Sequence, residues 1–177
     1  MHEQRGFTLL ELLVTLSLMA LLATLSAPVF SDLAMKTRLD TATDQLHLAI
    51  RHTRNAAVAR GTPVVIRAKS NGWERGWTIF VDRNADGRYQ SGEYRLRTAE
   101  PLPTSITVTA NAGIGEALHY QADGGTRRPS GSLQMGTLHV CRRAADGAIR
   151  ASRSIIINAS GRPRIERADM SADGTGC

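Results

Sequence analysis

The hydrophobic and polar positions divide the chain into stretches with different periods. Residues 7–30 are nearly all apolar, and Glu11 is the only charged side chain among them. Residues 31–60 then carry apolar side chains at three-and-four spacing, which is typical of a helix with one buried face. Gly61 follows and predicts the end of that helix. We therefore expect one long helix over residues 7–60.

The second half of this helix is amphipathic. Its apolar stripe would be buried against the rest of the chain, while its charged side chains lie off that stripe. The stripe consists of Leu39, Ala42, Leu46, Ala49, Ile50, Thr53, Ala56 and Ala57, and the charged residues beside it are Arg38, Asp44, Arg51 and Arg54.

After residue 61 the period changes to two, which predicts strands separated by turns rich in Gly, Asn, Asp and Pro. Two antiparallel sheets packed on the amphipathic half of the helix are the simplest arrangement, because they cover its apolar stripe. The sequence therefore predicts an α+β fold. The expected strands cover residues 62–68, 76–82, 93–98, 104–110, 117–122, 133–142, 151–159 and 162–166.

A short basic leader, residues 1–6, precedes the apolar stretch. The apolar stretch is long enough to span a bilayer as a helix, and the positive-inside rule would place the residues after it outside the cytoplasm. A cleaved secretory signal peptide is the alternative, although such peptides have shorter apolar cores. Glu11 is unusual in either setting, because a carboxylate within hydrocarbon costs on the order of a few kcal/mol.

Positive charge is concentrated in the last third of the chain. The 177 residues carry a formal net charge of +6. Residues 127–167 contain nine arginines and two acidic residues, so this stretch alone carries +7 and the remainder is close to neutral. Charge segregated in this way favours an anionic partner.

The sharpest element of this basic stretch is Gly161-Arg162-Pro163-Arg164. In an extended segment Arg162 and Arg164 would project from one face, and Pro163 would keep the segment at a sheet edge or in a loop. Guanidinium groups bind phosphate oxygens through paired hydrogen bonds. The alternatives are a solvated basic face and ion pairs to neighbouring subunits. Further candidates for the same phosphate-binding surface are Arg142, Arg143, Arg150, Arg153 and Arg167.

Residues 82–93 match the pattern of an EF-hand calcium loop. Asp82, Asn84, Asp86 and Glu93 would supply the oxygen ligands. Strand-like stretches flank this loop, whereas helices flank an EF-hand loop. We therefore favour a polar hairpin turn over a calcium site.

The two cysteines and five histidines indicate neither a zinc site nor a catalytic site. Cys141 and Cys177 lack the CxxC spacing of zinc sites, and a disulfide is their leading interpretation if the globular part lies outside the cytoplasm. The histidines match no recognisable catalytic motif. We therefore expect neither enzymatic activity nor a cofactor.

The stretch RGFTLLELL, residues 5–13, closely resembles the class III signal of type IV pilins and type II secretion pseudopilins. This resemblance implies that a prepilin peptidase cuts after Gly6 and that Phe7 becomes N-methylated. It also implies a role in filament assembly for Glu11, whose carboxylate would meet the N-terminal amine of a neighbouring subunit inside an apolar bundle.

Three further stretches resemble the GspH/FimT group of minor pilins and pseudopilins. The resemblance implies a type IV pilin-like fold, in which a disulfide between Cys141 and Cys177 ties down the last segment. The stretches are RNAAVARGTPVVI at 54–66, GWERGWTIFVDRNADG at 72–87 and IIINASGRPRIERADMSADGTGC at 155–177.

The resemblance also implies a function. FimT-type minor pilins with a Gly-Arg-x-Arg element near the C-terminus are associated with DNA binding during natural transformation. Carried onto this chain, the element is Gly161, Arg162 and Arg164, which would bind double-stranded DNA without reading its sequence. The alternative is a structural minor pseudopilin of type II secretion with no DNA role. A calcium-stabilised pseudopilin is a third hypothesis.

The expected organisation has four parts. Residues 1–6 are a prepilin leader, 7–30 a transmembrane and assembly helix, 31–60 its amphipathic continuation, and 61–177 a β-rich globular domain. This organisation predicts a single-pass protein of the bacterial inner membrane with a periplasmic C-terminal domain, which later enters a pilus at the cell surface. Its expected partners are double-stranded DNA, other major and minor pilins, and the prepilin peptidase.

Overall fold

The computed structural model describes residues 8–70, 72–167 and 177. Its first element is helix α1, Leu9–Arg60, which continues through Pro28 without interruption. The single long helix expected from the sequence is therefore confirmed, while its expected first residue, Phe7, lies outside the described residues. The chain divides into two compact units between Thr37 and Arg38, and each is described separately below.

The first unit contains the beginning of α1. The Thr8 hydroxyl accepts a hydrogen bond from the Glu11 backbone N–H at 3.2 Å, which caps one of the free donors at the helix start. The large apolar side chains from Leu9 to Leu22 are exposed, Leu9 by 83% and Leu22 by 65%. Over the part of the chain that the structure describes, no helix is both long and apolar enough to cross a bilayer.

The second unit begins with the amphipathic part of α1. Leu39, Leu46 and Ile50 are fully buried, and the rest of the predicted stripe is buried or partly buried with them. Thr43 was not predicted to be buried, and its hydroxyl donates to the Leu39 carbonyl at 2.8 Å, which satisfies it inside the core. The helix ends at Arg60, directly before the glycine that predicted its end.

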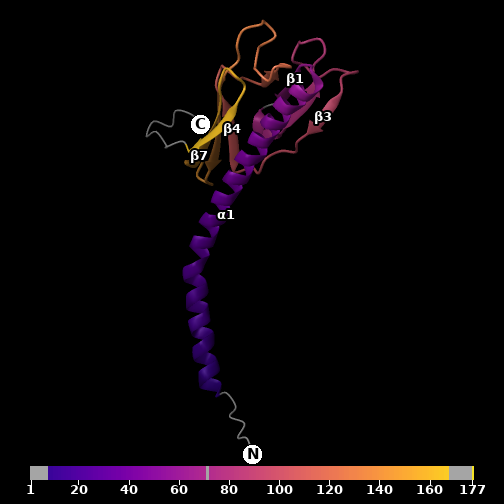
Figure 1. Cartoon of the computed structure of the whole chain (residues 1–177). Coiled ribbons are helices and arrows are strands. Elements are labelled where there is room, and N and C mark those ends of the chain that lie inside the picture. The colour runs from indigo at the N-terminus through magenta and orange to yellow at the C-terminus, as the bar shows by residue number, and fades with distance from the viewer. Residues whose placement is uncertain (1–7, 71, 168–176) are drawn as a thin grey trace, which may run out of the picture. The chain divides into compact units, whose positions relative to one another are not determined.

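The rest of this unit consists of two four-stranded antiparallel sheets (Figure 1). The first sheet has the order β3-β2-β1-β5 and the second has the order β4-β6-β7-β8. All eight strands lie where the alternating pattern predicted them, and the 3-10 turn η1 was not predicted. The elements are β1 (Val64–Ala68), η1 (Trp73–Arg75), β2 (Trp77–Val81), β3 (Arg95–Thr98), β4 (Ile106–Ala110), β5 (Ala117–Tyr120), β6 (Gly136–Arg143), β7 (Ile149–Ile157) and β8 (Pro163–Arg167).

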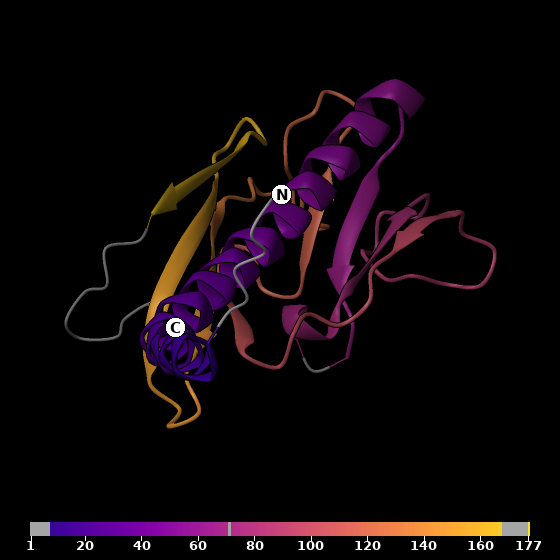
Figure 2. The same ribbon diagram turned by 90° about the horizontal axis from the view of Figure 1, so that it is seen from below.

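One hydrophobic core joins the helix to both sheets. Leu46 of α1, Ile66 of the first sheet and Leu138 of the second belong to the same buried cluster. Figure 2 shows the magenta and salmon strands of the first sheet on one side of the helix and the amber and yellow strands of the second sheet on the other. Burial of this shared apolar surface is the main favourable term in folding.

The chain crosses between the two sheets three times. Strands β1, β2 and β3 form part of the first sheet, β4 then enters the second sheet, and β5 returns to the first. Strands β6, β7 and β8 complete the second sheet, with β8 at its edge. Pro163 is the first residue of this edge strand, where a missing N–H costs least, as the sequence predicted.

Candidate nucleic-acid interface

The Gly-Arg-Pro-Arg element begins in the tight turn between β7 and β8, with Gly161 and Arg162, and continues into β8 with Pro163 and Arg164. The side-chain oxygen of Asn158 accepts hydrogen bonds from the Arg162 backbone N–H and from the Ser160 hydroxyl, each at 2.9 Å. The Gly161 N–H donates to the Asn158 carbonyl, also at 2.9 Å. An asparagine that bonds the backbone a few residues ahead is a common device for closing turns, and here it sets the backbone position of Arg162.

Gly161 fits this turn because of both its backbone angle and its surroundings. Its φ is +73°, in the left-handed region that side chains with a Cβ rarely adopt. A Cβ on Gly161 would lie 2.2 Å from the Gly124 carbonyl oxygen. The buried Tyr120 hydroxyl donates to the Gly161 carbonyl at 2.8 Å, and burial raises the pKa of Tyr120. The β7–β8 turn is therefore packed directly against the turn that contains Gly124.

That second turn, residues 121–125, connects the interface to helix α1. Its Gly124 N–H donates to the Gln121 carbonyl, and the Asp123 carboxylate accepts from the Gly125 N–H at 2.8 Å. The Arg54 side chain of α1 donates through Nε to the Gly124 carbonyl at 3.0 Å. Helix α1, the turn at residues 121–125 and the β7–β8 turn are thus linked by direct contacts.

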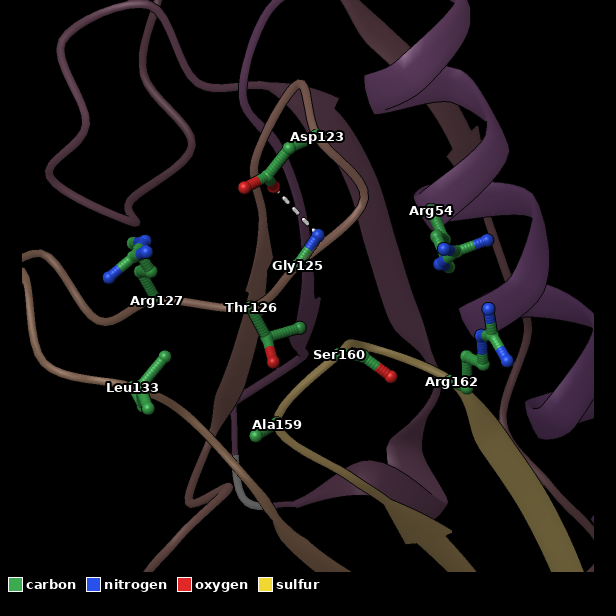
Figure 3. Close-up of a pocket in the computed structure, with 9 residues that line it drawn as sticks. All are labelled: Arg54, Asp123, Gly125, Thr126, Arg127, Leu133, Ala159, Ser160 and Arg162. Carbon is green, nitrogen blue, oxygen red and sulfur yellow. Dashed lines mark hydrogen bonds between the residues drawn. The ribbon is translucent and has the colours of Figure 1, made fainter.

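A hollow of about 320 Å³ lies between these elements. Three arginines line it: Arg54 from α1, Arg127 from the segment after β5, and Arg162 from the β7–β8 turn. In Figure 3, Arg54 and Arg162 lie close to the helix, and Arg127 lies on the opposite side with Thr126 and Ser160 between them. Asp123 is the one carboxylate in the lining.

Arg164 and Arg167 follow on β8, and both are exposed. The Arg164 guanidinium forms an ion pair with Glu166 at 2.9 Å. Arg167 lies opposite Arg153 in the β7–β8 register, and Arg153 forms an ion pair with Asp40 of α1 at 2.8 Å. Arg153 is largely buried, and this pair connects the second sheet to the helix.

The remaining predicted arginines lie at the other end of β7. Arg142 and Arg143 end β6, and Arg150 begins β7, whereas Arg162 follows the end of β7. A nine-residue strand spans about 26 Å, so the structure does not bring these three side chains together with Arg162. Arg143 bonds the carbonyls of Gly147 and Cys177, and Arg150 pairs with Asp146.

Sequence reasoning did not select Arg54 or Arg127 for this site. Arg127 was counted in the basic stretch but lies 35 positions before Arg162, and Arg54 was assigned only to the polar flank of α1. The close packing of the turn that contains Gly124 against the turn that contains Gly161 brings these arginines to one hollow. Nothing in the local sequence predicts this packing.

Cys141 and Cys177 form the disulfide that the sequence analysis expected, with their Cα atoms 6.2 Å apart. Cys141 is fully buried on β6, between β4 and β7. The bond therefore ties residue 177 to a central strand of the second sheet.

The loop at residues 82–93 connects strands β2 and β3, as expected for a hairpin turn. The Asp82 carboxylate accepts from the Gly87 N–H at 2.9 Å, and the Asp86 carboxylate accepts from the Arg88 N–H at 2.7 Å. Glu93 accepts from the Gln90 N–H at 2.9 Å, and Asn84 donates to Asp86. Within the described residues, no group of three or more His, Cys, Asp or Glu side chains could hold a metal ion.

At the other end of the chain, Gly6 and Phe7 lie outside the described residues. Glu11 lies in the first turn of α1, where a carboxylate interacts favourably with the helix dipole.

Comparison with known families shows the family of the protein. The family model described as "Type II transport protein GspH" matches residues 42–161, which include most of the β-rich unit. The chain belongs to the GspH family. A second model, the prokaryotic N-terminal methylation motif, matches residues 1–27 of this GspH-family chain.

Individual relatives agree with this assignment. Pilin-like protein PilA1 of Thermus thermophilus is 36% identical over 90 residues, which cover 51% of this chain and 56% of that protein. A fimbrial protein of Pseudomonas aeruginosa is 26% identical over 149 residues, covering 83% of this chain and 84% of the relative. The alignment thus spans little more than half the length of the Thermus protein.

The fold is that of type IV minor pilins. The crystal structure of the minor pilin FimU from Pseudomonas aeruginosa superposes with a TM-score of 0.57 at 21% identity, covering 74% of this chain and 90% of FimU. Together with the GspH family model and the N-terminal methylation motif, this fold places the protein in the type IV minor pilin and pseudopilin superfamily.

Proposed function

We propose that this GspH-family protein is a minor type IV pilin that binds double-stranded DNA without sequence preference, for DNA uptake in natural transformation. The observation that supports this most is the position of Arg162. Its backbone is held by the Asn158 turn, its side chain is exposed, and within the described residues it forms no ion pair. Arg164 follows on an exposed edge strand, where it forms an exposed ion pair with Glu166 of the kind that contributes little stability, so both guanidinium groups can bind neighbouring phosphates.

The N-terminal part has a separate role in this proposal. The methylation motif supports cleavage after Gly6, methylation of Phe7 and anchoring in the inner membrane before assembly with other pilins. The exposed leucines of α1 would then be covered by the helices of neighbouring subunits, because such a surface is unfavourable in water. Glu11 would pair with the N-terminal amine of one such subunit.

The assembly role of Glu11 is tested with Glu11→Ala. The variant should remain in the inner membrane but be depleted from sheared pili, because an unpaired N-terminal amine inside an apolar bundle is costly. Immunoblots of the membrane and pilus fractions measure this distribution. Glu3→Ala, in the leader that cleavage would remove, should behave as wild type. Normal incorporation of Glu11→Ala into pili would contradict the proposed pairing.

The DNA-binding role is tested with Arg162→Gln/Arg164→Gln in the full-length protein in detergent. Fluorescence anisotropy with a short duplex should show that wild-type binding weakens steeply with salt. Two lost phosphate contacts should lower the slope of log affinity against log salt by about 2.

The matched control is Arg95→Gln/Arg97→Gln on β3. These two exposed arginines have the same spacing and also lie on an edge strand, but in the first sheet. The control changes the net charge equally and should retain most of the affinity. Equal loss in both double variants would mean that net charge alone attracts DNA.

The alternative is a structural minor pseudopilin that does not bind DNA. The ion pairs of Arg153 with Asp40 and of Arg164 with Glu166 favour it, because they show arginines of this region engaged within the fold. Absence of salt-dependent binding by the wild-type protein would support this alternative.

A further inference from the structure

We propose that the hollow lined by Arg54, Arg127 and Arg162 is a phosphate-binding site, and that phosphodiesters of the DNA backbone occupy it. This inference rests on the proposed function and deepens it, because it adds Arg54 and Arg127 to the interface. It also separates Arg162, which lines the hollow, from Arg164, which follows on β8 and is not part of the lining.

The charge of the hollow favours an anion. Three arginines line it with one carboxylate, that of Asp123, which already accepts the Gly125 N–H. Among the residues that the structure describes, none of the three arginines forms an ion pair. In contrast, Arg67, Arg150, Arg153 and Arg164 each pair with a carboxylate within 3 Å.

The donors of the hollow also favour a phosphate. The Ser160 hydroxyl donates to Asn158, and the Thr126 hydroxyl donates to the Gln134 carbonyl, so these hydroxyl protons are already used. The unused donors are those of the guanidinium groups, which carry five N–H bonds each. The Arg54 Nε–H donates to the Gly124 carbonyl, which leaves the N–H groups of its two Nη atoms available to a ligand. Planar guanidinium groups match the paired oxygens of a phosphate.

The position of two arginines is set before any ligand arrives. Arg54 is held by the Gly124 carbonyl, and the backbone of Arg162 is held by Asn158. The close approach of Gly124 and Gly161 then fixes the distance between the two turns. Pre-positioned groups lose less conformational entropy on binding, which increases affinity. The hollow opens to solvent, so a phosphate that belongs to a longer chain can enter it.

The test compares single and double variants in the full-length protein in detergent, by anisotropy with a short duplex at several salt concentrations. Arg127→Gln and Arg162→Gln should each weaken binding roughly 10-fold at low salt and lower the salt slope by about 1. Because Arg127 and Arg162 lie on opposite sides of the hollow, each should contact its own phosphate, and the double variant should lower the slope by about 2 in total. Additive losses are expected for residues that do not act on a common group.

Two neighbouring arginines provide matched controls. Arg128 follows Arg127 in sequence, but its guanidinium bonds the carbonyls of Ala112 and Gly113 at 2.7 and 3.1 Å, outside the hollow. Arg51 lies exposed on α1, one turn before Arg54. Arg51→Gln and Arg128→Gln should keep the wild-type slope.

A second probe, inorganic phosphate, separates the site from the function. Phosphate at constant ionic strength should raise the melting temperature of the wild-type protein and not that of Arg127→Gln, because a ligand stabilises the state that binds it. Phosphate stabilisation without DNA binding would support the site and overturn the proposed function. DNA binding that needs Arg162 and Arg164 but not Arg127 would overturn the phosphate-binding hollow and leave the function standing.

Discussion

At the residue scale, Gly161 has more influence on the interface than its missing side chain suggests. It occupies a left-handed conformation, it approaches the Gly124 carbonyl too closely for any Cβ, and its own carbonyl accepts the buried Tyr120 hydroxyl. Together these contacts place Arg162 beside Arg54. The glycine of the Gly-Arg-Pro-Arg element therefore positions the arginines, which are the groups available to a ligand.

Gly161→Ala should lower the free energy of unfolding by about 2 kcal/mol or more, because it adds a steric overlap to the cost of a left-handed alanine. Gly147→Ala is the matched control, since Gly147 has a φ of +80° but open space where a Cβ would be. The control should cost about 1 kcal/mol. Urea unfolding measures both free energies. Equal losses of stability would mean that the steric overlap with Gly124 contributes nothing to the effect of Gly161→Ala.

At the element scale, α1 is held in the second unit by a narrow row of side chains. Leu46 is fully buried among both sheets, while Leu48, two residues later, is 58% exposed. Arg153 of β7 adds an ion pair to Asp40 on the same helix. The helix is thus attached mainly by hydrophobic contacts, with one ionic contact beside them.

Leu46→Ala should lower the free energy of unfolding by about 2–5 kcal/mol, because it removes buried apolar surface and leaves a cavity. Leu48→Ala makes the same chemical change on the same helix and should change the free energy of unfolding by no more than about 0.5 kcal/mol. Denaturant titration of both variants provides the comparison. Similar values for the two would show that the buried stripe does not attach the helix.

The elements themselves could be predicted from sequence to a large extent. Alternation and turn residues located all eight strands, and the three-and-four spacing located the buried face of α1, because these patterns are local. Partners of strands could not be predicted, since nothing near β4 indicates that it pairs with β6 instead of β3. The same limit applies to the hollow, where Arg54 and Arg162 meet only through tertiary contacts.

At the scale of the whole molecule, the disulfide closes a loop between residues 36 positions apart. That loop includes β7, β8 and the β7–β8 turn with Arg162. The bond therefore restrains the unfolded chain across the region that carries the candidate interface.

Cys141→Ser/Cys177→Ser should lower the free energy of unfolding by roughly 3–4 kcal/mol in the chain-entropy treatment of loop closure. Thermal unfolding with and without a reductant measures the effect, and the reductant should destabilise the wild type but not the variant. A wild-type melting temperature that does not respond to complete reduction would contradict the prediction.

The crossing of the chain between the sheets also decides how the second unit can be divided. A cut before β5 would remove an edge strand from the first sheet, and a cut after β5 would leave β4 without its partner β6. The helix stripe is shared by both sheets wherever the cut is made. Between β1 and β8, every single break therefore separates a strand from its own sheet. An expression fragment with only one of the two sheets would be incomplete, and the two sheets should fold and unfold together as one cooperative unit.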